Sequence, residues 1–272
     1  MKIAPGSRLQ APGKDLEPRT SNLERRTAEE RLIVALDFTV LEPAVRMARQ
    51  VRGLARTLKI GSALFTACGP SAIRRVQALG FSVMLDLKFF DIPSTVELSC
   101  RAAARHRVAM LTVHAAGGRA MLEAAVRGAR EEARRLNRRR PLVLAVTVLT
   151  SVDRAPASSL AQRVSAMAAV ALEAGCDGLV ASAQEAGMLR RRFGPRPRIV
   201  CPGIRPGSLQ GTRASTGASP MAPDDQRRVC TPSAALAAGA DALVIGRPIT
   251  AARRPRAAAQ RIFEELEEIT AC

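Results

Sequence analysis

Residues 83–93 read VMLDLKFFDIP, an apolar run of strand length that ends in three ionisable side chains and a proline. Apolar residues recur at every second position from Val83, and a period of two indicates a β-strand. Asp86 and Lys88 therefore lie on one face of the strand, whereas Asp91 follows its end, because Pro93 cannot continue a ladder. Buried charges must pair. The stretch indicates either a solvated edge strand with a surface ion pair or an active site at the end of a barrel strand.

Short apolar runs recur along the chain, each followed by a segment of helical pattern. They comprise the strand that begins at residue 83 and residues 32–36, 58–61, 109–113, 142–149, 178–181, 198–201 and 242–245. Continuous apolar strands that alternate with helices indicate a parallel sheet buried on both faces. Eight such units predict an α/β fold, a single-domain (β/α)8 TIM barrel. The alternative is an open doubly wound sheet, but no GxGxxG motif follows the first strand.

The first residues of the chain differ in composition from the rest. Residues 1–28 are polar, rich in Pro, Gly and Ser, and without periodicity, so we expect a disordered or loosely attached extension before a barrel domain at residues 29–272. We expect no membrane span and no secretory signal, because no apolar run is long enough. The six cysteines are scattered and only two histidines are present. This pattern indicates reduced thiols in a cytoplasmic protein and no zinc site.

The chain is strongly basic, with 42 Lys and Arg against 24 Asp and Glu and a net charge of +18. Such a charge indicates an anionic partner, either a phosphorylated metabolite or nucleic acid. Because the chain has no Trp or Tyr and only seven Phe, platforms on which single-stranded bases could stack are scarce. We therefore interpret the arginine clusters as solvated faces and expect no nucleic-acid partner.

Polar side chains stand at or just past most of the predicted strand ends. In a parallel barrel these ends share one mouth, where the active site lies. The loops after the seventh and eighth strands, residues 202–206 and 246–248, combine Gly with Arg, which suits a phosphate. A core histidine explains His114 equally well. The residues expected to converge are Asp37, Lys59, Asp86, Lys88, His114, Thr150, Arg205 and Arg247.

A series of motifs in this order resembles the bacterial type of the orotidine 5'-phosphate decarboxylase family over residues 31–264. The most specific motif is residues 86–93, with Thr95 two positions on. The other matching motifs are residues 35–37, 59–61, 112–115, 148–151, 202–206, 225–228 and 246–248. The resemblance implies decarboxylation of orotidine 5'-phosphate to uridine 5'-phosphate, the last step of de novo pyrimidine nucleotide synthesis, without a metal or cofactor.

The resemblance also implies catalytic roles. Lys88 would be the general acid that protonates C6 of the pyrimidine, in an alternating charge array with Lys59, Asp86 and Asp91. Lys59 would also contact the substrate, and Asp86 would lie beside the substrate carboxylate. Asp91 and Thr95 would enter the site from the other subunit of a homodimer, so that each active site is shared.

The same resemblance implies how the nucleotide would be held. Asp37 would hold a ribose hydroxyl, and Thr150 or Ser151 would contact the base. The phosphate would be bound by Arg205, Gln226, Gly246 and Arg247, with Gln226 bridging towards the base.

The chain departs from the family pattern in three places. Phe90 stands where histidine is frequent, Ser94 stands where asparagine is frequent, and residues 207–223 form a longer segment than usual. Two alternatives are considered beside this family: a magnesium-dependent sugar-phosphate decarboxylase or aldolase of the same superfamily, which shares the Asp-x-Lys-x-x-Asp core, and a basic nucleic-acid-binding protein.

Overall fold

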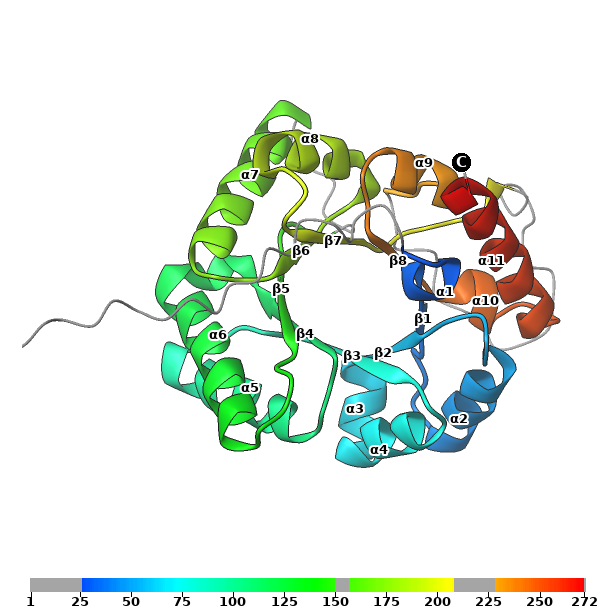
Figure 1. Cartoon of the computed structure of the whole chain (residues 1–272), viewed down its shortest axis with the longest axis horizontal. Coiled ribbons are helices and arrows are strands. Elements are labelled where there is room, and N and C mark those ends of the chain that lie inside the picture. Colours follow the sequence, from blue (N-terminus) through cyan, green and yellow to red (C-terminus); the bar gives the residue numbers. More distant parts are fainter. Residues whose placement is uncertain (1–25, 150–156, 208–227, 272) are drawn as a thin grey trace, which may run out of the picture.

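Each strand of the chain pairs with the next along the sequence, until the eighth returns to the first. The computed structural model describes residues 26–149, 157–207 and 228–271. All the pairings are parallel, and the sheet closes in the order β1 to β8. Figure 1 looks down this barrel, with the helices arranged around it. The predicted (β/α)8 barrel is confirmed.

The strands occupy nearly the positions expected from the apolar runs. They are β1 Leu32–Ala35, β2 Thr57–Gly61, β3 Ser82–Phe89, β4 Met110–His114, β5 Leu142–Val146, β6 Gly178–Val180, β7 Arg198–Cys201 and β8 Ala242–Ile245. The helices are α1 Ala28–Arg31, α2 Leu41–Gln50, α3 Ser62–Cys68, α4 Pro70–Ala78, α5 Pro93–Arg105, η1 Ala115–Gly117, α6 Gly118–Arg135, α7 Ala157–Glu173, α8 Ala183–Phe193, α9 Pro232–Ala237, α10 Arg247–Thr250 and α11 Pro255–Ala271.

Two apolar layers hold the barrel together. One fills its interior with side chains such as Ile33, Met84, Leu144 and Val200. The other lies between the strands and the surrounding helices. Successive strand residues contribute to opposite layers, because side chains alternate along a strand. Burying one such side chain contributes about 1.5–3 kcal/mol, so the two layers together fix the strand ends that carry the polar groups.

Several short elements were not predicted. The fifth strand ends at Val146 rather than at residue 149. Helix α3 follows β2 without an intervening turn and is separated from α4 by Gly69, whose φ of 57° favours glycine. Helices α1 and α10 span four residues each and η1 spans three. Elements this short carry too little periodicity to be recognised in a sequence.

The predicted extension, residues 1–28, lies almost wholly outside the described residues. Within its last three residues, Arg26 lies 3.5 Å from Asp241 and Ala28 is buried. Among the helices of the described ranges, none has both the length and the hydropathy needed to cross a membrane.

Candidate active site

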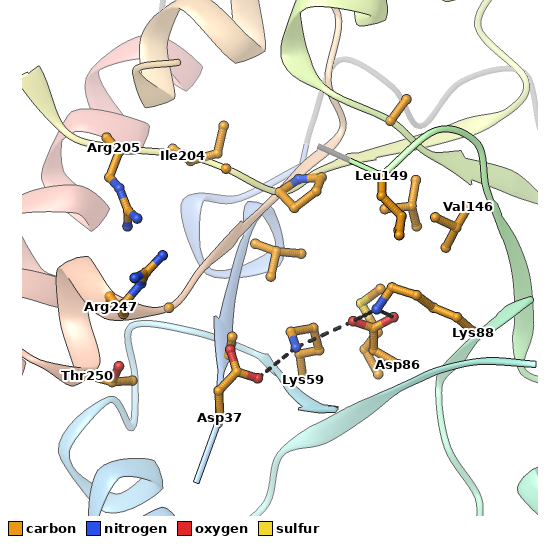
Figure 2. A pocket seen from close by; sticks show the side chains of 18 of the residues that line it. Asp37, Lys59, Asp86, Lys88, Val146, Leu149, Ile204, Arg205, Arg247 and Thr250 are labelled. Atoms are coloured by element: carbon orange, nitrogen blue, oxygen red, sulfur yellow. Dashed lines mark hydrogen bonds and ion pairs between the residues drawn. The ribbon is translucent and has the colours of Figure 1, made fainter. Parts of the chain in front are cut away.

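A pocket of about 800 Å³ opens at the carboxyl end of the barrel strands. Figure 2 shows Lys88 and Asp86 on one side of it and the guanidinium groups of Arg205 and Arg247 on the other. The last residues of the strands and the loops after them form its walls. Six of the eight strand-end residues expected to converge therefore face one space, as expected for this fold: Asp37, Lys59, Asp86, Lys88, Arg205 and Arg247.

Four charged side chains of alternating sign form a row along the pocket. Lys59 Nζ lies 3.0 Å from Asp37 Oδ1 and 3.4 Å from Asp86 Oδ2. Lys88 Nζ lies 3.0 Å from both carboxylate oxygens of Asp86. The side chains of Lys59 and Asp86 are each 11% exposed, against 38% for Lys88. Asp86 is thus held from both sides, while the ammonium group of Lys88 remains accessible to a ligand.

The row of charges shifts the pKa of its buried members. Burial alone would lower the pKa of Lys59, but the negative charges of Asp86 and Asp37 outweigh it, and the pKa is raised. Burial alone would raise the pKa of Asp86, but Lys59, Lys88 and a hydrogen bond from Thr112 lower it. Both shifts favour the ionised forms. Lys59 and Asp86 therefore stay ionised at neutral pH.

The backbone of β3 is irregular where it presents Lys88. The register between β3 and β4 shifts between Leu85 and Phe89, and Lys88 has a φ of 50°. A positive φ is uncommon for a side chain other than glycine and marks stored strain, which is frequent at functional sites. The irregularity withdraws the Lys88 amide from the ladder, and this amide donates instead to Thr112 Oγ1 at 2.9 Å.

Thr112 on β4 completes the support of the acidic group. Its side chain is fully buried, and its hydroxyl donates to Asp86 Oδ1 at 2.9 Å. One hydroxyl therefore fixes both the Asp86 carboxylate and the Lys88 backbone. Thr112 belongs to the motif at residues 112–115, but no role was predicted for it. The signal that could have found it is its position two residues before His114, which places it on the same face of the strand.

Gly61, at the end of β2, permits the close packing of the ion pairs. A Cβ at this position would lie 3.1 Å from Lys59 Nζ and 3.2 Å from Asp37 Oδ1. Any other residue would therefore crowd the contact between the two charges. Gly61 belongs to the motif at residues 59–61, but only the folded structure shows that its missing side chain leaves space for the pair of Lys59 and Asp37.

His114, at the end of β4, has a local structural role. Its Nδ1 accepts a hydrogen bond from the Ala116 amide at 3.2 Å, which caps η1. Its ring lies 5.5 Å from that of Phe90. Burial, with the nearby charge of Lys88, lowers its pKa, so the ring is neutral at pH 7. It is not among the residues that line the pocket.

The other end of the pocket is basic. Arg205 follows β7 and Arg247 begins α10, and both line the pocket with Gly203 and Gly246. The loop that carries Arg205 is anchored by its amide, which donates to the Cys230 carbonyl at 2.8 Å, while the Cys230 amide donates to the Gly203 carbonyl at 3.2 Å. Two guanidinium groups on an anchored loop and a helix start suit a phosphate group.

A buried arginine links two loops of this end. Arg228 pairs with Glu185 of α8, and its Nη2 donates to the carbonyl oxygens of Val148 and Leu149 at 3.3 and 3.1 Å. Both of these residues line the pocket. Arg228 therefore ties the chain that returns after β7 to the chain that leaves β5. Arg228 belongs to the motif at residues 225–228, but this role was not predicted.

Asp91 and Thr95 do not line the pocket of their own chain. Both are exposed, and Asp91 Oδ1 accepts a hydrogen bond from the Ile92 amide at 2.6 Å. The exposed apolar side chains of Phe90, Ile92 and Leu98 lie close to them in the sequence, each more than 60% exposed. Thr150, Ser151 and Gln226 were also predicted in the site and lie outside the described residues.

A family model described as "Orotidine 5'-phosphate decarboxylase / HUMPS family" matches residues 30–262. The chain belongs to this family. The resemblance inferred from the motifs is therefore confirmed.

Individual members of the orotidine 5'-phosphate decarboxylase family resemble the chain over most of its length. The orotidine 5'-phosphate decarboxylase of Moorella thermoacetica is 46% identical over 253 residues, covering 90% of this chain and 95% of the relative. That of Halorhodospira halophila is 46% identical over 242 residues, covering 87% and 95%. The crystal structure of orotidine 5'-phosphate decarboxylase from Lactobacillus acidophilus matches with a TM-score of 0.70 and 31% identity, covering 86% of this chain and 98% of the other.

Proposed function

We propose that the chain decarboxylates orotidine 5'-phosphate to uridine 5'-phosphate, the last step of de novo pyrimidine nucleotide synthesis. The observation that carries the proposal is one pocket with a row of alternating charges at one end and two arginines at the other. This spacing suits a nucleotide whose reacting base and phosphate are held apart. The relatives from Moorella thermoacetica and Halorhodospira halophila carry the name of this decarboxylase.

The reaction explains why fixed charges are needed. Loss of carbon dioxide leaves an electron pair on C6 in the plane of the pyrimidine ring, where the ring cannot delocalise it. A fixed positive charge that faces C6 stabilises this carbanion as it forms. Lys88 is the accessible cation of the row, and we assign it as the general acid that transfers a proton from Nζ to C6.

Asp86 would act on the departing group. Its carboxylate would lie beside the carboxylate of the substrate, and the repulsion between the two would disappear as carbon dioxide leaves. Such a contact speeds the reaction only because it is relieved in the transition state. Lys59 and Thr112 hold Asp86 in its ionised form, since both stabilise the charged carboxylate.

The remaining contacts would bind the nucleotide. Arg205 and Arg247 would hold the phosphate, with Gly246 and Gln226, and Asp37 would hold a ribose hydroxyl. Thr150 or Ser151 would contact the base. Binding energy gained at the phosphate, far from C6, can order the site around the reacting end.

We further propose a homodimer in which Asp91 and Thr95 complete the site of the partner. Both are exposed and outside their own pocket, next to exposed apolar side chains. Exposed apolar residues grouped in this way are typical of an interface. Asp91 would become the last acidic member of the partner's charge row, next to Lys88.

We place the reaction in the cytoplasm. All five described cysteines are free thiols, and burial raises the pKa of Cys100 and Cys176 to about 12, so their thiolate forms are suppressed. Unpaired thiols are typical of a reducing compartment.

The test is the loss of orotidine 5'-phosphate absorbance, with release of carbon dioxide, on adding the purified full-length protein in the presence of EDTA. The proposal predicts turnover that EDTA does not reduce. The alternative within the family is a magnesium-dependent sugar-phosphate enzyme, which EDTA would inactivate. No turnover of orotidine 5'-phosphate, with or without added magnesium, would contradict the proposal.

A further inference from the structure

A second cavity, of about 590 Å³, opens at the opposite, amino-terminal end of the barrel. The first residues of five strands line it: Thr57, Ser82, Met110, Leu142 and Arg198. The packed interior of the barrel, including the fully buried side chains of Leu144 and Val200, lies between this cavity and the catalytic pocket. The two cavities are therefore separate sites.

The second cavity is strongly basic. Seven arginines line it, and Glu30 is the one carboxylate among the described residues that do so. Three of the arginines approach acidic groups: Arg140 holds Asp177 through two hydrogen bonds of 2.6 and 2.7 Å, and Arg56 and Arg26 each approach one carboxylate at 3.5 Å. The described carboxylates do not neutralise the cavity.

Three more arginines, Arg107, Arg138 and Arg139, face the cavity from two turns. All three are exposed, and none forms an ion pair with a carboxylate of the described part of the chain. Arg107 lies in the turn between α5 and β4, and the other two lie between α6 and β5. The turns bring these cations together from positions about thirty residues apart in the sequence.

Stabilisation of helix ends does not account for these arginines. Cations at the carboxyl end of a helix offset its dipole, but the last turn of α6 already carries Arg134 and Arg135. Arg107 has a φ of 56°, the left-handed conformation in which the residue after a helix commonly ends it, and this turn places Arg107 at the cavity.

We propose that this cavity binds a compact polyanion with two or more linked phosphate groups. Guanidinium groups bind phosphate oxygens through paired hydrogen bonds, and the cluster of Arg107, Arg138 and Arg139 offers several at once. The volume is within the range of about 300–1,000 Å³ that is usual for small-molecule sites. Thr57 and Ser82 add hydroxyl groups to the wall.

The lining favours a polyphosphate over other anions. Among the described residues that line the cavity, none is aromatic, so it offers no surface on which a base could stack. The phosphate groups themselves are therefore the part recognised, in inorganic triphosphate or in a nucleoside triphosphate.

The experiment is calorimetric titration of the full-length protein with inorganic triphosphate, in an Arg205→Ala/Arg247→Ala background that removes the cations of the catalytic pocket. The cluster variant Arg107→Gln/Arg138→Gln/Arg139→Gln should bind at least about a hundredfold more weakly, since a single charge-assisted contact is worth about tenfold or more. Each single substitution should lower the affinity for inorganic triphosphate about tenfold.

A matched control removes the same charge elsewhere. Arg46, Arg49 and Arg191 are exposed residues of α2 and α8 that do not line the cavity. Their triple replacement by Gln should change the affinity by less than about threefold, because exposed charges at a distance are screened. Thermal unfolding of each variant checks that the fold is kept; should the triple cluster variant fail to fold, the single variants provide the test.

The outcomes separate the proposal from its competitors. Equal losses in the cluster and control variants would show general attraction to a basic protein and would overturn the site. Absence of binding at about 1 mM triphosphate, or tighter binding of duplex DNA that depends on the cluster, would overturn it as well. Comparable affinity for inorganic triphosphate and nucleoside triphosphates would confirm that the cavity recognises the phosphates. Tighter binding of one nucleoside triphosphate than of inorganic triphosphate would identify that nucleotide as the ligand. None of these outcomes depends on the proposed decarboxylation.

Discussion

The two carboxylate oxygens of Asp86 lie at the same distance, 3.0 Å, from the ammonium nitrogen of Lys88. The proton donor proposed for C6 is thus fixed by the residue that would crowd the departing carboxylate. Asp86 is fixed in turn by Lys59 and Thr112. The proposed chemistry therefore depends on a few contacts that single substitutions can test.

Removal of the proposed acid should abolish the reaction and preserve the fold. Lys88→Ala should lower kcat by at least about a thousandfold, because general acid catalysis and fixed-charge stabilisation are each worth about a hundredfold or more. Steady-state kinetics measure the loss, and thermal unfolding checks the fold. A variant within tenfold of the wild-type rate would rule out Lys88 as the donor.

The buried hydroxyl of Thr112 should support both the fold and the rate. Thr112→Val keeps the shape but removes one hydrogen bond from Asp86 and leaves the Lys88 amide without its partner, which should cost about 1–3 kcal/mol in the free energy of unfolding. We expect kcat to fall more than KM rises. Thr112→Ser is the matched control and should restore both quantities. If Val and Ser behave alike, the hydroxyl has no part in positioning the charges.

Arg247 should contribute to binding of the phosphate and not of the base. Arg247→Ala should weaken binding of uridine 5'-phosphate by about 1.5–3 kcal/mol, the range for hydrogen bonds to charged groups, and leave the affinity for uridine unchanged. Arg253→Ala removes an exposed arginine a few residues away and should change neither affinity. Equal losses for the nucleotide and the nucleoside would contradict the assignment.

Asp91 should act across a subunit interface. Lys88→Ala and Asp91→Ala proteins should each be nearly inactive. When they are refolded together in equal amounts, about half of the dimers should be mixed, and each mixed dimer contains one site lacking both residues and one intact site. Activity should then rise to roughly one quarter of the wild-type value, as twofold pairing requires.

Two control measurements are needed to interpret the complementation experiment. Native mass spectrometry establishes that mixed dimers form, and a mixture of each variant with itself provides the baseline. If mixed dimers form and the mixture stays as inactive as its parents, Asp91 does not serve the partner.

The charged row should make stability depend on pH at acid values. The pKa of Asp86 in the folded protein lies below its ordinary value of 3.8, so its contribution is present above pH 3.8 and is lost as the pH falls through the lowered pKa. The difference in free energy of unfolding between the wild type and Asp86→Asn should therefore be constant near neutrality and shrink below about pH 4. Urea unfolding over this range measures it. A difference that does not change with pH would show that the carboxylate is not stabilised in the folded state.

Much of this protein could be predicted from local sequence. The apolar runs predicted all eight strands, because strands buried on both faces have no polar alternation and are bounded by clear helical patterns. Residues 83–93 also identified Asp86 and Lys88 as neighbours, since residues two apart in a strand share a face. The short helices α1, α10 and η1 escaped prediction, because three or four residues of helix show no period. Helix α3, with seven residues, is under two turns long and shows little more.

The contacts that join two strands or two loops of the site could not be predicted from the sequence and are seen only in the tertiary structure. Thr112 supports Asp86 only because β4 lies beside β3, and Gly61 matters only because the charges of Lys59 and Asp37 approach each other next to it. The positive φ of Lys88 arises from the register shift between two strands, which no single strand encodes. The basic cavity at the amino-terminal end likewise joins turns that are distant along the chain. Sequence periodicity determines which residues form each element and which way they face, whereas contacts between elements depend on the closure of the barrel.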